Sequence, residues 1–235
     1  MRSKVSYFAV ALTLVAVSLP SMADTVILLH GLARTEKSMQ VLERALQQRG
    51  YCVVNAGYDS RGSDIETLAV AAIEPALAVC PQSRQLHFVT HSLGGILVRQ
   101  FLVHHDIENL GRVVMLGPPN KGSEVVDKLR DVPGFHFING DAGLELGTGA
   151  TSVPNKLGRA DFDVGIIAGT RSVNLILSSL IPGADDGKVS VDSTRLEGMS
   201  DHLEMAVTHP FMMRNDAVIE QVIHYLETGK FKRAE

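Results

Sequence analysis

Short apolar stretches alternate with segments of helical periodicity along this chain, and this alternation constrains its fold more than any other feature. The apolar stretches are rich in β-branched residues and have the length of buried strands; they lie at 25–29, 51–54, 86–90, 112–116 and 164–168. The intervening helical pattern is clearest at 65–77, after a candidate N-cap at Asp64. Strands that alternate with helices predict a parallel sheet covered on both faces. We therefore expect an α/β fold with a doubly wound, mostly parallel sheet in a single domain.

The segment 135–158 departs from this pattern. It is rich in glycine and has neither helical nor strand periodicity. It is also longer than most connections between elements of a compact domain. Two interpretations remain open, a lid or binding segment and a disordered surface loop.

The first 23 residues have the organisation of a secretory signal peptide. Arg2 and Lys4 precede an apolar run of 15 residues at 5–19, and small residues, Ser21 and Ala23, lie where a signal peptidase reads. A membrane anchor is the alternative, but the run is shorter than the roughly 20 residues that span a bilayer. We expect cleavage after Ala23, export to the periplasm or the medium, and one domain over residues 24–235.

Charge and cysteine content narrow the possible partners. Loss of Arg2 and Lys4 would change the formal net charge from −4 to −6, and no basic patch is visible, so nucleic acid is not an expected partner. The two cysteines, Cys52 and Cys80, can form one disulfide after export or remain as thiols in a reducing compartment. The sequence leaves both states open.

The strongest functional signal is the decapeptide L-H-F-V-T-H-S-L-G-G at 86–95. A predicted strand runs directly into Ser92, and glycines follow before a helix begins. A serine on such a sharp strand-to-helix turn projects its Oγ above the sheet, within reach of a base. The first glycine of the usual G-x-S-x-G pattern is replaced by Thr90, which is still small. An ordinary serine cap of a helix is the alternative interpretation.

A second motif, L-L-H-G-L at 28–32, follows the first predicted strand. An oxyanion hole needs two backbone N–H groups that converge on one point. Leu93, directly after Ser92, can supply one, and Leu32 is placed in the sequence to supply the other. We expect His30 to brace this loop and His91 to pack beside the serine.

Together these motifs resemble those of bacterial lipases and related α/β-hydrolases, as does G-P-P-N-K-G-S at 117–123. The resemblance extends over residues 25–226. It implies the α/β-hydrolase fold, hydrolysis of carboxylic esters including lipid esters, and catalytic residues in the order Ser, Asp, His. It implies no cofactor and no metal, and it allows transient contact with lipid surfaces.

The resemblance also selects the acid. In D-D-G-K-V at 185–189, the aspartate just before the glycine matches the acid of the lipases, which is Asp186. Asp185 is the alternative if the turn differs, and a D-D-G sequence is also simply a good turn. Asp163 precedes its strand and Asp192 lies beyond the motif, so both match less well.

Three histidines follow Asp186, namely His202, His209 and His224. His224 falls within a terminal amphipathic helix whose apolar residues are at 219, 222, 223 and 226. A last strand at 203–207 would place His209 between the last strand and the last helix, where α/β-hydrolases have their histidine. We therefore predict His209 as the base, with His202 as the alternative.

These residues predict a defined chemistry. Ser92 would attack an acyl carbon, His209 would take its proton and Asp186 would orient the imidazole. The same triad can cleave thioesters or amides, and a hydrolase scaffold can also serve as a binding protein without catalysis. No histidine or cysteine cluster has zinc-like spacing, and no G-x-G-x-x-G follows the first strand, which disfavours a dinucleotide-binding domain.

Overall fold

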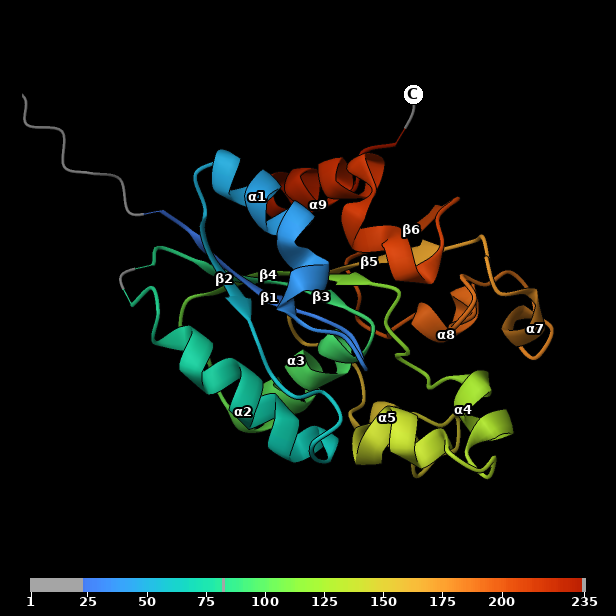
Figure 1. Cartoon of the computed structure of the whole chain (residues 1–235). Coiled ribbons are helices and arrows are strands. Elements are labelled where there is room, and N and C mark those ends of the chain that lie inside the picture. Colours follow the sequence, from blue (N-terminus) through green and yellow to red (C-terminus); the bar gives the residue numbers. More distant parts are fainter. Residues whose placement is uncertain (1–22, 82, 234–235) are drawn as a thin grey trace, which may run out of the picture.

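The computed structural model of the chain describes residues 23–81 and 83–233 (Figure 1). Apart from Ala23, the predicted signal peptide lies outside these residues. The described residues form one parallel sheet of six strands in the order β2-β1-β3-β4-β5-β6. The strands are β1 (Thr25–Leu29), β2 (Cys52–Ala56), β3 (Leu86–His91), β4 (Leu110–Leu116), β5 (Val164–Gly169) and β6 (Asp201–Met205).

Helices cover both faces of this sheet (Figure 1). On one face lie α1 (Gln40–Gln48) and α9 (Asp216–Thr228), and on the other lie α2 (Ile65–Leu77) and α3 (Leu93–His104). Alternate residues of β1 point to opposite faces, so that Val26 packs on the side of α1 and α9, and Ile27 on the side of α2 and α3. Burial on both faces explains why the inner strands β1 and β5 are almost entirely apolar, whereas β3 also buries His87, Thr90 and His91.

Shorter elements complete the chain, mostly beyond the carboxyl ends of the strands. They are η1 (Glu36–Met39), α4 (Glu124–Leu129), α5 (Phe135–Leu144), α6 (Val153–Lys156), α7 (Leu175–Ser178), α8 (Val191–Thr194) and η2 (His209–Arg214). None of the helices in the described residues is both long and apolar enough to cross a membrane.

The helix at 65–77 is confirmed in its bounds and in its cap, because the Asp64 carboxylate accepts a hydrogen bond from the Thr67 N–H. The last strand, by contrast, begins and ends two residues earlier than the predicted 203–207. It runs along β5 from the pair Gly165–Asp201 to the pair Gly169–Met205. Because β6 is a half-exposed edge strand, its apolar residues do not mark its bounds.

The segment 135–158 is not a disordered loop, because it contains α5 and α6. Its helical periodicity is hidden by a break at Gly140, whose φ of 65° is left-handed. A Cβ on Gly140 would clash with the carbonyl oxygen of Arg61, so the glycine allows α5 to lie close to the loop that precedes α2. Gly140, one of the glycines that made this segment look like a loop, therefore permits a kink within a helix.

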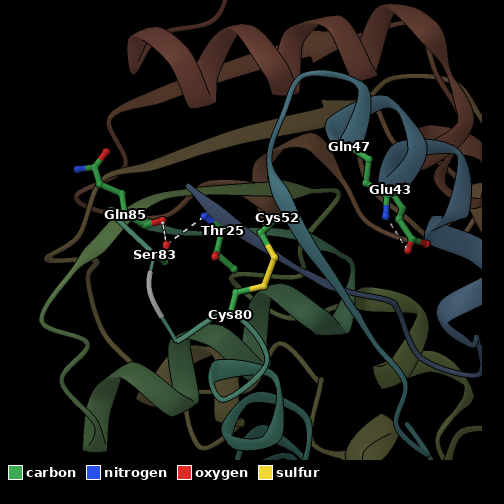
Figure 2. Close-up of a disulfide and its surroundings, with 7 residues drawn as sticks. All are labelled: Thr25, Glu43, Gln47, Cys52, Cys80, Ser83 and Gln85. Carbon is green, nitrogen blue, oxygen red and sulfur yellow. Dashed lines mark hydrogen bonds between the residues drawn. A yellow bond between two sulfur atoms is a disulfide. The ribbon is translucent and has the colours of Figure 1, made fainter. Parts of the chain in front are cut away.

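A disulfide joins Cys52 to Cys80, which answers the question left open by the sequence (Figure 2). Cys52 begins the edge strand β2, and Cys80 lies in the turn between α2 and β3. The same turn is held to the sheet by Ser83, whose Oγ accepts from the Thr25 N–H at 3.1 Å (Figure 2). The bond therefore ties the end of α2 to a strand that has only one neighbour.

We expect the double substitution Cys52→Ser, Cys80→Ser to lower the free energy of unfolding by about 3–4 kcal/mol, because the bond closes a loop with a sequence separation of 28 in the unfolded chain. Thermal and urea denaturation of both proteins would measure this loss. Reductant should destabilise the wild type equally and leave the double variant unchanged. Equal stability of all four samples would contradict the expectation.

Candidate active site

The candidate site lies where the chain reverses the direction in which it adds strands. After β1 the chain adds β2 on one side, and it then crosses to place β3 on the other side of β1. In open parallel sheets the loops that leave two such strands diverge and leave a crevice at their carboxyl ends. Here these loops carry Leu32 and Ser92, and both residues line one cavity of about 290 Å³.

Ser92 stands on a sharp turn between β3 and α3. Its backbone has φ 53° and ψ −119°, a conformation that residues with a side chain rarely adopt. The turn is packed too tightly for further side chains, since a Cβ on Gly94 would lie 2.6 Å from the Leu29 carbonyl oxygen. Thr90, which replaces the usual glycine, is accommodated with its side chain fully buried. The local sequence thus produces the strained turn that the serine motif predicts.

The loop after β1 lies against this turn. A Cβ on Gly31 would be 2.8 Å from His91 Nδ1 and 3.1 Å from Ser92 Cβ, so any larger residue would require these neighbours to shift. The loop continues through Ala33, which has φ 53° and whose N–H donates to Ser60 Oγ at 3.0 Å. Neither the Leu32 N–H nor the Leu93 N–H donates to another described residue. Two backbone donors beside Ser92 therefore remain available to a bound group.

His30 packs against the same loop and bonds to its backbone. Its ring stacks on Tyr58 with the ring centroids 4.0 Å apart, and its Nδ1 donates to the Gly31 carbonyl at 2.9 Å. The Tyr58 hydroxyl in turn donates to the His30 carbonyl at 2.5 Å. His30 thus braces the loop and is fully buried.

Asp186 and His209 are joined by two hydrogen bonds. His209 Nδ1 lies 2.7 Å from Asp186 Oδ2, and the His209 N–H donates to the Asp186 carbonyl at 2.9 Å. The other carboxylate oxygen, Oδ1, accepts from the N–H groups of Lys188 and Val189 at 3.0 and 2.9 Å. Asp186 is fully buried, and His209 is 6% exposed and faces the cavity. A buried carboxylate thereby fixes the orientation of an imidazole.

The alternative residues lie elsewhere. Asp185 accepts from Ser178 Oγ and from the Gly187 N–H, and His202 sits within β6 with its Nε2 2.9 Å from Thr194 Oγ1. Asp163 bonds to Arg112 and Tyr225, and Asp192 pairs with Lys121. His224 is half-buried on α9. None of the alternative aspartates and histidines lines the cavity of Ser92.

His91 fixes His209 from the opposite side. Its Nε2–H donates to the His209 carbonyl at 3.0 Å, and the two rings are 4.7 Å apart between centroids. Burial, and then the charge of a protonated His209, hold the pKa of His91 well below its usual range. His91 therefore stays neutral and acts as a donor. Its backbone contact to His209 is not visible from the sequence, in which the two residues are more than a hundred positions apart.

Ser92 and His209 line the same cavity, but no hydrogen bond joins Ser92 Oγ to His209 among the described residues. Such contacts are often long without substrate and tighten when it binds. Gly117, in the G-P-P-N-K-G-S segment, lies against the contact between Asp186 and His209. Its φ is 55°, and a Cβ at this position would be 2.9 Å from Asp186 Oδ2. This glycine leaves room for the aspartate–histidine contact.

Sequence reasoning missed a buried arginine that holds this segment. Arg99 on α3 is 4% exposed and donates to Asn120, Pro154 and Gly158. Burial lowers its pKa to about 10. The missed signal was a cation in the middle of an otherwise apolar helix. Two further missed residues, Arg34 and Lys188, line the cavity.

No group of three or more His, Cys, Asp or Glu side chains in the described part of the chain is arranged to hold a metal ion. Most of the other residues that line the cavity are apolar, several of them from α4 and α5, and Ser123 and Asn139 are polar exceptions. The segment 135–158 therefore contributes to the wall of the cavity, through Phe135, Ile138, Asn139 and Leu146.

No protein-family model matches the sequence. A sequence search of curated proteins also finds no match. The fold, however, matches solved structures along most of the chain. The mature lipase BlEst2 of Bacillus licheniformis has a TM-score of 0.67 and 17% identity, covering 91% of this chain and 96% of that one.

Two other solved structures extend the comparison. Phospholipase PlaB of Legionella pneumophila has a TM-score of 0.64 and 15% identity, covering 88% of this chain and 63% of that one. The Pyrococcus furiosus esterase PF2001 has a TM-score of 0.59 and 17% identity, covering 88% and 82%. The parallel sheet, its two helical layers and these similarities show that the chain has the α/β-hydrolase fold.

Proposed function

We propose that this chain is a serine hydrolase that cleaves carboxylic esters through an acyl-enzyme. Ser92 is the nucleophile, His209 the general base and Asp186 the residue that orients the base. The observation that carries the proposal is the buried 2.7 Å contact between Asp186 and His209 at the cavity that Ser92 lines. A helix cap needs no such partner, so the ordinary-serine interpretation leaves this contact unexplained.

The reaction follows from the chemistry of these groups. A hydroxyl is a weak nucleophile at neutral pH, so His209 Nε2 must take the Ser92 proton as Oγ bonds to the acyl carbon. The ester C–O bond then breaks, and the protonated His209 gives its proton to the departing alcohol. Water adds to the acyl carbon of the acyl-enzyme, again with His209 as base, and releases the acid and Ser92. Asp186 keeps the proton of neutral His209 on Nδ1, which leaves Nε2 free to accept.

The oxyanion of each tetrahedral intermediate is bound by the N–H groups of Leu32 and Leu93. Both belong to loops that are fixed before substrate arrives, through Ser60, Tyr58 and the Ser92 turn. Preorganised donors of this kind are worth roughly 100- to 1,000-fold in rate each. Leu93 also begins α3, whose N-terminal dipole favours the negative charge.

The substrates are proposed to include lipid esters. Most of the residues that line the cavity are apolar, and α5 contributes Phe135 and Ile138 to it; on this helix Ile138 and its neighbour Phe137 are 58% and 87% exposed. Exposed apolar side chains on a helix that lines the cavity suit transient contact with a lipid surface. The structural similarity to lipases, a phospholipase and an esterase supports an ester substrate.

We also propose that the chain is exported to the periplasm or the medium after cleavage near Ala23. The basic and apolar pattern of residues 1–23 supports this assignment. The disulfide between Cys52 and Cys80 supports it independently, because such bonds persist in oxidising compartments.

A fluorophosphonate probe tests the proposal directly. We expect the probe to label the wild type at Ser92, as read by mass spectrometry of the labelled peptide, and Ser92→Ala to remain unlabelled. Ser123→Ala is the matched control, since Ser123 lines the same cavity with its Oγ bonded to the Lys188 carbonyl. This variant should be labelled at Ser92 like the wild type.

A folded wild type that is neither labelled nor able to hydrolyse a chromogenic ester would refute the proposal and favour a binding protein. An oxygen ester, a thioester and an anilide with the same acyl group then separate the possible activities. We expect the oxygen ester to be cleaved with the highest kcat/KM.

A further inference from the structure

Apolar and cationic residues both line the cavity of Ser92. The apolar residues are the majority and include Leu32, Val125, Val126, Phe135, Leu146 and Val189. Two cationic side chains, Arg34 and Lys188, line the same cavity. No aspartate or glutamate is among the described residues that line the cavity. The site therefore presents two cationic side chains, and no lining carboxylate, beside the proposed nucleophile.

The backbone of Lys188 is fixed by the proposed triad itself. Its N–H donates to Asp186 Oδ1 at 3.0 Å, and its carbonyl accepts from Ser123 Oγ at 3.0 Å. Burial, and then the charge of Arg34, lower the pKa of its ammonium, while Asp186 acts in the opposite direction. The negative charge of Asp186 is already shared among His209 and two backbone N–H groups.

Neither cation has an ion-pair partner within the part of the chain that the structure describes. Two like charges that lower the pKa of one of them repel each other in the free protein. An anion placed between them would remove this repulsion and would accept charge-assisted hydrogen bonds from both.

The positive charge continues into a neighbouring hollow of about 800 Å³, which shares Ala33 and Arg34 with the cavity. Four cationic residues line this hollow, against two carboxylates. The cations are Arg34, Lys37, Arg61 and Arg214, and the carboxylates are Glu36 and Asp59. A substrate that extends from Ser92 past Arg34 therefore enters a wider, polar and net positive space.

We propose that the preferred substrate is an ester with an apolar acyl group and an anionic alcohol portion, a phosphate or a carboxylate. The acyl chain packs against the apolar residues of the cavity, and the anion is bound by Arg34 and Lys188. This inference rests on the proposed ester hydrolysis and specifies the substrate class for the same site. The cations bind the alcohol side, so they select the substrate without taking part in proton transfer.

Three esters of one acid test the inference. Octanoylglycerol is neutral, octanoylglycerol phosphate carries a phosphate, and octanoylglycolate carries a carboxylate; all three release octanoate, which is quantified directly. At low salt we expect kcat/KM for the wild type to be about 10-fold higher for the phosphate ester than for octanoylglycerol, which corresponds to one charge-assisted hydrogen bond. A similar preference for octanoylglycolate would show that a carboxylate serves as well as a phosphate. If only the phosphate ester is preferred, the site requires a phosphate. Either result agrees with the proposal.

The double substitution Arg34→Gln, Lys188→Gln should remove this preference, mainly through the KM of the anionic ester. The readout is the ratio of the two kcat/KM values, in which general effects on folding or chemistry cancel. Arg44→Gln, Lys230→Gln is the charge-matched control, since neither residue lines the cavity or the neighbouring hollow, and it should keep the wild-type ratio. Added salt should reduce the preference of the wild type.

Equal kcat/KM for the neutral and anionic esters in the wild type would overturn the inference and leave the proposed hydrolysis intact. A ratio that falls equally in the control variant would also overturn it, because overall charge would then be the cause. Failure to release octanoate from any ester, together with no fluorophosphonate labelling, would instead refute the proposed function.

Discussion

Replacing His209 by alanine is expected to lower kcat for ester hydrolysis by roughly a million-fold, the scale seen when one member of a triad is removed. The imidazole is the group that takes the Ser92 proton, and Asp186, His91 and the backbone hold it in place. No other histidine that follows Asp186 lines the cavity. Chromogenic ester turnover, with circular dichroism to confirm folding, measures the effect.

His202→Ala is the matched control for this prediction. His202 lies on β6 and contacts Thr194, so its loss should affect stability by about 1 kcal/mol and leave kcat within a few-fold of the wild type. If His202→Ala abolished turnover while His209→Ala retained it, the assignment of the base would be wrong.

Asp186→Asn is expected to lower kcat by about 10,000-fold while the protein keeps its fold. The Asp186 Oδ1 accepts two backbone N–H groups, so the asparagine oxygen must occupy that position. Its NH2 group then faces His209 Nδ1 and donates to it. The neutral imidazole is forced to carry its proton on Nε2, where it cannot accept the proton of Ser92.

Asp185→Asn provides the comparison. Asp185 accepts from Ser178 and Gly187 and has no contact with His209, so this change should alter kcat by less than about 10-fold. Nearly equal losses in the two variants would show that the turn, and not the carboxylate at 186, determines the rate.

The sequence predicted the architecture well because the burial of each strand determines which residues occur within that strand. Strands buried on both faces are mostly apolar, and β1 and β5 show this pattern clearly, while β3 also buries two histidines and a threonine. The pattern was weaker at β6, an edge strand, and the bounds there were wrong by two residues. It also failed at α5, because the break at Gly140 interrupts the helical period.

Some features of the candidate site could also be predicted from the sequence, and others could not. The serine turn was predictable because its requirements are local: Gly94 must allow a close approach to Leu29, and Ser92 must take an unusual backbone conformation. The choice between His202 and His209 was not local, because it depended on where β6 ends and on which ring meets Asp186. Arg34 and Lys188 acquired meaning only when the fold placed both beside Ser92.

The sequence alone therefore determined the order of strands and helices, the position of the serine turn and the order of the polar residues that follow it. The tertiary structure decided which aspartate meets which histidine, that Cys52 bonds Cys80, and that two cations share the cavity with Ser92. Backbone conformation and burial depend on neighbouring residues, so sequence patterns report them. A contact between residues that are distant in the chain depends on how strands align and where loops end, and no local pattern records that alignment.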